Sequence, residues 1–393
     1  MNNQIITSAL DTDKYEYTMK LAKQKKHPNV IGTYEYTLRS KENLLHLVEP
    51  IREQVRAMNG LQATIEENIW LEGSIPGAVS HTYDSSTIGV YQSTNNCGLK
   101  IISEDVIAES SMWEVPTLAI VSELYFRDKY RDNYDAIEDM LFDEVTVEVF
   151  RAKLLTKRYP TIKFNVSEFG TRRRFSRRLQ KRVIELLVNE LDGHLTGTSN
   201  LSLAMKYNLE GIGTVAHAWT MLYQGLVHPA DSQVMALRDW NEVFPNSIAL
   251  TDTLGSEKWE RDFTVDLAKA YKGQRHDSAN PYNWGAKRVE SYIKQGINPL
   301  DKSFVFSDGL TLSDGFMLSK HFDGKIGRVD NGIGTSLTNP TIASIGHKAL
   351  QQVMKLVKVN GRAVAKLSDN PEKSQCPYSD EHLTNLRFVA KNY

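Results

Sequence analysis

The chain has 393 residues, of which 41% are apolar and 24% charged, an ordinary globular composition with material for two or three domains. Its 47 basic and 48 acidic residues leave a net charge of −1, which argues against a general nucleic-acid or membrane-surface binder. The cysteines are Cys97 and Cys376, so we expect a reducing cytoplasmic compartment, without a disulfide framework or a zinc site. No apolar run approaches the ~18 residues of a membrane span, and residues 1–4 lack the layout of a secretion signal.

The first part of the chain predicts a mixture of helices and strands. A helix is expected from Lys14, with a capping residue among positions 11–13. Tyr15 lies near this helix start, where core packing is the common role of a tyrosine. β-favouring runs and apolar helical faces then predict further elements, namely strands at 30–38 and 99–107 and helices at 115–130 and 135–157.

From about Pro160 onward, short apolar strands alternate with helices. This alternation is typical of βα units and predicts a parallel sheet or barrel. The strands are expected at 161–166, 211–215, 247–250, 273–276, 303–306 and 325–329, with another near 194–198.

The end of the chain predicts a return to the first part. Asn360-Gly361 lies between two β-favouring runs, which is a hairpin signal. We therefore expect residues 1–158 and 336–393 to form one discontinuous domain, and residues 159–335 to form a barrel domain inserted into it.

Arginines follow the first strand of the predicted barrel, in the segment Glu168-Phe169-Gly170-Thr171-Arg172-Arg173-Arg174. If Thr171 caps a helix, three cations lie in its first turn, where they oppose the positive helix end. A multiply charged anion bound there would explain this placement. A solvated basic helix is an equally good interpretation.

His217 follows the small-residue strand end Gly213-Thr214-Val215-Ala216, about one turn inside a predicted helix. A neutral imidazole can accept a phosphoryl group, and a phosphate would lie near the helix start. A hydrogen-bonded, partly buried histidine is the common alternative for any single histidine.

The remaining strand ends carry further polar groups. Asp252 can hold Mg²⁺ through water or, more commonly, cap the next helix. Arg275 offers a planar fork for a carboxylate or phosphate, and Asp277 can stabilise a developing positive charge. Three more strand-end segments contain hydroxyl groups, an aspartate and glycine turns that suit phosphate, namely Ser278, Asp308-Gly309 and Gly334-Thr335. Each of these turns is a weak signal alone.

The shared position of these groups carries the argument. Each group lies just after the carboxyl end of a predicted strand, where barrel and doubly wound folds place their active sites. The inventory suits a phosphorylated sugar and a reaction that stabilises charge on both sides of a breaking bond.

Taken as a set, the segments resemble the nicotinate phosphoribosyltransferase family. The matching segments occur in family order along nearly the whole chain: Asp11-Thr12-Asp13-Lys14-Tyr15, Glu114-Val115-Pro116, Glu168 to Arg174, Thr198-Ser199-Asn200, Gly213 to His217, Thr251-Asp252-Thr253, Arg275-His276-Asp277-Ser278, Ser307-Asp308-Gly309 and Gly332-Ile333-Gly334-Thr335. One difference is Ala279-Asn280, where the family pattern has Gly-Asp.

The resemblance implies an α/β fold, with an irregular, incomplete α/β barrel beside an α/β sandwich domain. It implies phosphoribosyl transfer from phosphoribosyl pyrophosphate to nicotinate in NAD salvage, coupled to ATP through a phosphohistidine at His217. It also implies Mg²⁺ and a homodimer with shared active sites, in which Tyr15 reaches the partner's site.

By the same resemblance, His217, Arg275 and Asp277 are the catalytic candidates, and the metal ligands are not assigned. Nicotinate contacts would fall on Tyr15, Thr214 and Arg275. The other substrate-binding candidates are Phe169, Arg172, Ser278, Asp308, Gly309, Gly334 and Thr335.

Three alternatives stay open from the sequence. A related enzyme could use nicotinamide or quinolinate, although Arg275 favours a carboxylate. A binding or regulatory protein could keep the fold without catalysis. A barrel aldolase or lyase would need a Schiff-base lysine, and none lies at the polar strand ends of the central motifs.

Overall fold

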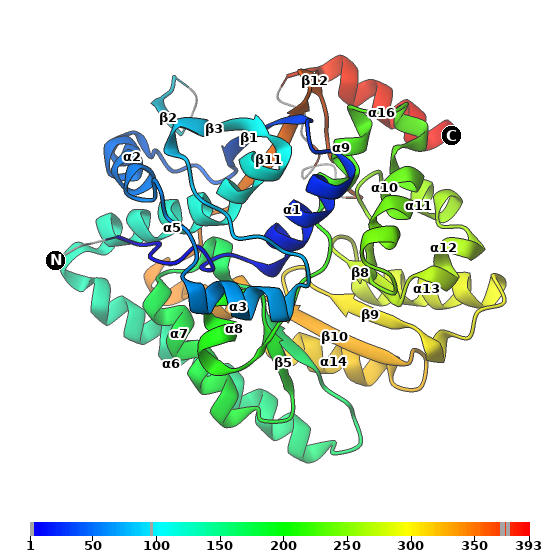
Figure 1. The fold of residues 1–393 in the computed structure, drawn as a ribbon. Helices are drawn as coiled ribbons and strands as arrows, with labels where there is room; N and C mark the ends of the chain where they lie inside the picture. Colours follow the sequence, from blue (N-terminus) through cyan, green and yellow to red (C-terminus); the bar gives the residue numbers. More distant parts are fainter. Residues whose placement is uncertain (1–3, 95–96, 370–373, 375–377) are drawn as a thin grey trace.

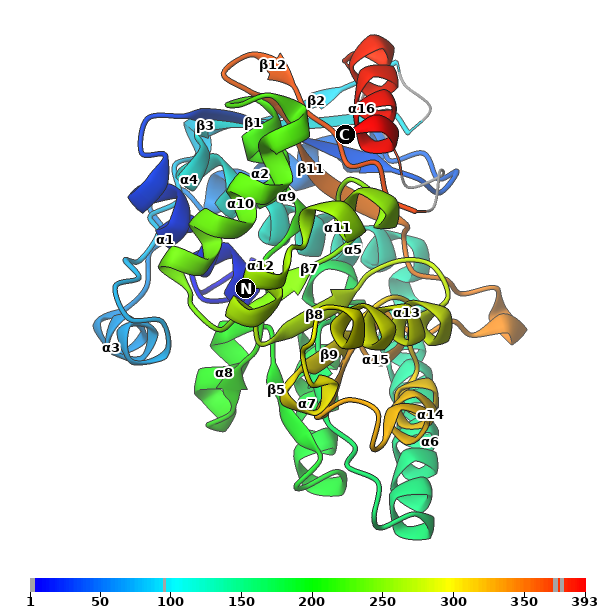
Figure 2. The ribbon, with the colours of Figure 1, turned by 90° about the vertical axis from the view of Figure 1, so that its right-hand side faces the viewer.

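The computed structural model of the chain describes residues 4–94, 97–369, 374 and 378–393, so Cys376 and residues 1–3 lie outside the described part (Figure 1). Two sheets organise these residues, and both views show the antiparallel sheet above the parallel one (Figures 1 and 2). The expectation of an α/β fold, with an irregular, incomplete barrel beside a second α/β domain, is confirmed.

The antiparallel sheet has five strands in the order β12-β11-β1-β3-β2. Their bounds are β1 Ile31–Leu38, β2 Ile88–Gln92, β3 Leu99–Val106, β11 Gln352–Val359 and β12 Arg362–Ala363. The predicted hairpin is present, because Val359 pairs with Arg362 across the Asn360-Gly361 turn. β11 also pairs along its length with β1, so the tail does return to the first part of the chain.

The second sheet has seven parallel strands in the order β6-β5-β4-β10-β9-β8-β7. Their bounds are β4 Val166–Glu168, β5 Leu195–Thr198, β6 Glu210–Gly211, β7 Ile248–Leu250, β8 Gly273–His276, β9 Ser303–Phe306 and β10 Arg328–Ile333. Within the described residues, β6 and β7 form the two ends of the sheet and do not pair, so the barrel is incomplete. All seven strands lie within residues 159–335; the domain limits themselves stay a prediction.

Three predicted strands differ from the observed ones for local reasons. β4 begins at Val166 rather than 161. β6 stops at Gly211, because the following backbone leaves the sheet to contact the N-terminal segment, where a Cβ on Gly213 would lie 3.2 Å from the Tyr15 nitrogen. β10 begins at Arg328, because the amides of Lys325 and Ile326 still bond to the end of the preceding helix at the Phe322 carbonyl.

Helices cover both sheets. The bounds in the first part are α1 Lys14–Lys26, α2 Val48–Ala57, α3 Ile65–Ser74, α4 Ile107–Ser110, α5 Glu114–Tyr130 and α6 Tyr134–Arg158. The bounds that follow are α7 Arg177–Glu190, α8 Leu201–Tyr207, α9 His217–Gln224, α10 Pro229–Val243, α11 Ser256–Asp262, α12 Val265–Ala270, α13 Pro281–Lys294, α14 Leu312–Phe322, α15 Thr335–Thr338 and α16 Asp380–Asn392. Among the described residues, no helix combines the length and apolar character needed to cross a membrane.

The arginine segment after β4 is not the start of a helix, contrary to the prediction. Thr171–Arg173 form a single 3-10 turn, and α7 begins only at Arg177. Its capping residue is Ser176, whose hydroxyl accepts a hydrogen bond from the Leu179 amide at 2.8 Å. The three arginines therefore do not lie in the first turn of a helix, where their charges would be unfavourable. Their side chains extend in different directions.

Candidate active site

A cavity of about 770 Å³ lies at the carboxyl ends of the parallel strands. One wall comes from loops after β4, β8, β9 and β10, and another from β11 and the tail of the antiparallel part. The predicted site residues that line it are Tyr15, Phe169, Arg172, Thr214, His217, Arg275, Asp277, Asp308, Gly309, Gly334 and Thr335. Ser278 is the exception: it is buried behind the wall, and its hydroxyl donates to Asp252 at 2.7 Å.

Glycines at the strand ends allow the residues that line the cavity to approach one another closely. A Cβ on Gly332 would lie 2.4 Å from the Phe169 ring, so the ring rests directly on β10. Gly309 has φ of +65°, a left-handed conformation that costs glycine little. The position of Phe169 after β4 and the turn after β9 therefore depend on residues without a side chain at 332 and 309.

The three arginines after Gly170 have separate roles. Arg172 faces the cavity and lies 3.6 Å from Glu114. Arg173 donates to the carbonyl of Gln352 at the start of β11. Arg174 is fully buried and forms a two-point ion pair with Asp11, at 2.7 and 2.9 Å. The expected anion-binding cluster is thus wrong for Arg174, which joins the N-terminal segment to the barrel.

Arg275 is held at the end of β8 by three partners. It donates to the hydroxyl groups of Thr214 and Ser307, each at 2.8 Å, and to Asp277 at 3.1 Å. Its side chain keeps 14% of its surface exposed toward the cavity. The planar fork is thus oriented before a ligand arrives, which lowers the entropy lost on binding a carboxylate.

His217 lies between two acidic groups and a lysine. Its Nδ1 is 2.9 Å from the Thr253 hydroxyl, and its Nε2 is 2.9 Å from Asp277 and 3.5 Å from Asp252. The Nζ of Lys366 is 2.8 Å from the same Nε2. His217 also begins α9, rather than lying one turn inside it as predicted.

The charges of this cluster shift one another's pKa values. Burial lowers the pKa of His217 below its ordinary value, and the charge of Lys366 lowers it further. Burial by itself would raise the pKa of Asp277, but Lys366, His217 and Arg275 outweigh it and hold that pKa well below its usual range. The arrangement favours a neutral imidazole beside ionised carboxylates.

Sequence reasoning missed Lys366, the group in closest contact with His217. It lies in the tail after β12 and forms ion pairs with Asp252 at 3.0 Å and Asp277 at 3.1 Å. Burial would lower its pKa, but the two carboxylates more than compensate and raise it. The available signal was a lone lysine in the apolar run Val364-Ala365-Lys366-Leu367, since a buried lysine requires partners.

The same cluster does not fit Mg²⁺. The ligand atoms of His217, Asp252 and Asp277 lie within 4.8 Å of one another, as a metal site would require. However, Lys366 already places a cation among them, and Mg²⁺ prefers oxygen ligands to imidazole. Asp252 also does not cap the next helix, since Gly255 holds the N-cap position of α11.

Tyr15 lines the cavity of its own chain. Its hydroxyl donates to Glu114 at 3.0 Å, and the residue is 7% exposed. Arg172 lies over the same ring, 5.8 Å from its centre. The N-terminal segment is fixed here by the Lys14 amide, which bonds to the Ser199 carbonyl at 2.7 Å.

Ala279-Asn280 has a structural consequence. Ala279 adopts a φ of +70°, a conformation that favours glycine. The Asn280 side chain accepts hydrogen bonds from the amides of Tyr282 and Asn283, and so caps α13. Asn280 therefore forms the start of a helix.

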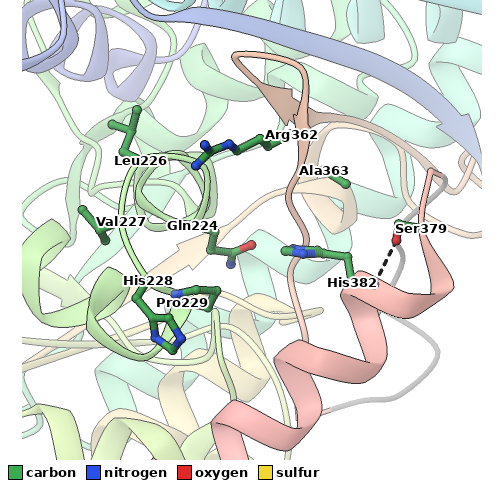
Figure 3. A pocket seen from close by; sticks show the side chains of 9 residues that line it. All are labelled: Gln224, Leu226, Val227, His228, Pro229, Arg362, Ala363, Ser379 and His382. Atoms are coloured by element: carbon green, nitrogen blue, oxygen red, sulfur yellow. Dashed lines mark hydrogen bonds between the residues drawn. The ribbon is translucent and has the colours of Figure 1, made fainter.

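A second hollow of about 610 Å³ lies outside this site (Figure 3). It is bordered by the α9–α10 connection, β12 and the start of α16. None of the predicted site residues lines it. At its wall, the Gln224 side chain exchanges two hydrogen bonds with the backbone of Ala365, at 2.7 and 2.9 Å. This contact fixes the segment that carries Lys366.

An incomplete parallel barrel, with a cavity at its strand ends lined by arginines, lysines and carboxylates, is typical of barrel enzymes that act on small charged substrates. Comparison with known proteins is consistent with this class. Residues 164–392 match the model of the nicotinate phosphoribosyltransferase family, and residues 10–122 match the model of that family's N-terminal domain. The chain belongs to the nicotinate phosphoribosyltransferase family.

Individual members of the family are similar to this chain over most of its length. A nicotinate phosphoribosyltransferase of Vibrio parahaemolyticus is 35% identical, over 95% of this chain and 89% of its own length. One from Sodalis glossinidius is 37% identical, over 95% and 92%. The crystal structure of a nicotinate phosphoribosyltransferase from Vibrio cholerae superposes with a TM-score of 0.92 at 32% identity, covering 100% of this chain and 95% of that one.

Proposed function

We propose that this protein transfers a phosphoribosyl group from phosphoribosyl pyrophosphate to nicotinate, giving nicotinate mononucleotide and pyrophosphate in NAD salvage. The observation that carries the proposal is the convergence of Arg275, His217 and Thr335 on one cavity. The names of the relatives and the family match support the same reaction.

In this reaction the lone pair of the pyridine nitrogen forms a bond to C1 of the ribose. The bond from that carbon to the pyrophosphate oxygen breaks, and pyrophosphate leaves with the electron pair. Positive charge develops on the sugar and negative charge on the leaving group. We assign Asp277 to the first charge, and Arg172 and the cavity's other cations to the second, because all of them line the cavity.

Nicotinate recognition rests on Arg275 and its neighbours. A carboxylate on the ring can accept two hydrogen bonds from a guanidinium fork. Arg275 is already oriented by Thr214 and Ser307, and the Phe169 and Tyr15 rings line the same cavity. An acidic pyridine therefore fits better than its uncharged amide.

We further propose that ATP hydrolysis drives the transfer through a phosphohistidine at His217. The support is the contact set of this residue, which favours an uncharged and therefore nucleophilic imidazole. Mg²⁺ would enter with the phosphorylated substrates and neutralise the leaving pyrophosphate. The Asp308 carboxylate, in the loop after β9, lines the cavity and could supply an oxygen ligand.

The test is a comparison of steady-state rates on nicotinate, nicotinamide and quinolinate, each with phosphoribosyl pyrophosphate, Mg²⁺ and ATP. We expect the highest kcat/KM with nicotinate. A clear preference for nicotinamide or quinolinate would overturn the assignment of the acceptor. We also retain a cytoplasmic homodimer as a proposal, with oligomeric state measured by sedimentation.

A further inference from the structure

Lys366 comes from the end of the chain, yet its position within the site is tightly fixed. The Ala365 backbone is bonded to Gln224 on α9, the helix that begins with His217. The Leu367 amide bonds to the Thr253 carbonyl at 2.9 Å. The Ser256 amide bonds to Asp369 at 2.7 Å. The segment is thus anchored on both sides of Lys366, to the elements that carry His217 and Asp252.

The lysine is central to the electrostatics of the cluster. Its ammonium lies 2.8 to 3.1 Å from His217, Asp252 and Asp277, and only 8% of its side chain is exposed. Two carboxylates beside an imidazole would by themselves favour the protonated, charged ring. A buried cation at this point opposes that protonation.

We propose that Lys366 is a positioning residue, whose ammonium balances Asp252 and Asp277 and thereby keeps His217 as the uncharged imidazole that accepts a phosphoryl group. This inference rests on the proposed phosphohistidine. In that step a ring nitrogen donates its lone pair to the γ-phosphorus of ATP. The bond from this phosphorus to its bridging oxygen breaks, ADP leaves with the electron pair, and the ring N–H proton is released to water.

The groups that face His217 come from three other elements. The loop after β7 supplies Asp252 and Thr253, and the end of β8 supplies Asp277, which in turn pairs with Arg275. The tail supplies Lys366. In Lys366→Met the two carboxylates remain while the cation is lost, so the pKa of His217 rises.

The first experiment measures phosphorylation of the intact protein by ATP as a function of pH. Lys366→Met should lose on the order of tenfold in rate near pH 7, because each pKa unit of His217 protonation is worth a factor of ten. The rate should recover as pH rises and the imidazole loses its proton. Lys366→Arg should keep the profile of the wild type, and the exposed Lys348→Met serves as the matched control.

If a folded Lys366→Met loses phosphorylation rate by the same factor at every pH, the inference is overturned. Such a loss would not arise from protonation of His217, which depends on pH. Thermal unfolding of each variant checks the fold. If Lys366→Met does not fold, Lys366→Gln replaces it in the same measurement.

The second experiment requires neither ATP nor turnover. The chain has 10 histidines, and the NMR signal of His217 is identified by its loss in His217→Asn. We expect the titration midpoint of this imidazole to lie below that of an ordinary histidine in the wild type and to rise in Lys366→Met. An unchanged midpoint in the variant would refute the role of Lys366. If the wild type takes no phosphate from ATP, the phosphohistidine proposal fails, while this titration still decides what Lys366 does.

Discussion

The guanidinium of Arg275 donates to the hydroxyl of Thr214 at 2.8 Å, across the gap between the end of β8 and the loop after β6. Both residues are candidates for nicotinate contact, and they lie far apart along the chain. Their hydrogen bond fixes the direction of the fork toward the cavity. The geometry of the proposed acceptor site is therefore set before any substrate binds.

Replacing Arg275 with alanine should weaken nicotinate binding more than sugar binding. A hydrogen bond to a charged group contributes about 1.5 to 3 kcal/mol, so KM for nicotinate should rise roughly 10- to 100-fold. KM for phosphoribosyl pyrophosphate should change much less. Steady-state kinetics with each substrate varied in turn measure both values, and a loss confined to the sugar phosphate would show that the role is misassigned.

Lys355 should take up a proton when a polyphosphate substrate binds. Burial, with the charges of Arg39 and Lys366, lowers the pKa of Lys355 to about 7, so its amine is mostly neutral at pH 8. Bound phosphates favour the charged form and raise that pKa, giving uptake of up to about one proton. Calorimetric titration with ATP in two buffers of different ionisation enthalpy measures the uptake.

In Lys355→Met this uptake should disappear, whereas Lys348→Met should leave it unchanged. Uptake of equal size in Lys355→Met would place the titrating group elsewhere.

Tyr15 should serve the site of its own chain. Its hydroxyl is bonded to Glu114, and both residues line the cavity that contains His217. Mixing Tyr15→Ala with His217→Asn, neither of which should show ATP-stimulated transfer alone, should therefore restore no ATP-stimulated transfer, even if the protein is a dimer. Recovery to about a quarter or more of the wild-type rate, as shared sites would give, would contradict this arrangement.

Ala279→Gly should stabilise the protein. The left-handed conformation at position 279 costs alanine about 1 kcal/mol, whereas it costs glycine little. Glycine also gains freedom in the unfolded chain, which offsets part of the benefit. We expect a net gain below ~1 kcal/mol in the free energy of unfolding, measured by urea titration. A loss of stability would mean that the methyl group makes a favourable contact.

Much of the barrel could be predicted because its central strands are short, largely buried and separated by helical segments. Strands β8 and β9 have the predicted limits 273–276 and 303–306. The cavity could also be predicted, since parallel strands bring their carboxyl ends to one edge. The limits of strand β6 could not be predicted, because its length is set by contact of Gly213 with the N-terminal segment.

Ion pairs between residues far apart along the chain could not be predicted from the sequence either. Arg174 looked like its neighbour Arg172, and only the packing shows that Asp11 binds it. Lys366 lies 149 residues beyond His217, in a tail that the sequence assigned to the other domain. No periodicity or local motif encodes such a contact.

The central claim is the reaction itself, and analysis of its products tests it most directly. Nicotinate, phosphoribosyl pyrophosphate, Mg²⁺ and ATP are mixed with the wild type and with His217→Asn, and products are measured by mass spectrometry with and without ATP. We predict nicotinate mononucleotide and pyrophosphate in equal amounts, with ATP stimulation in the wild type alone and slower, ATP-independent formation in the variant. Binding of nicotinate and phosphoribosyl pyrophosphate without any nicotinate mononucleotide would contradict it.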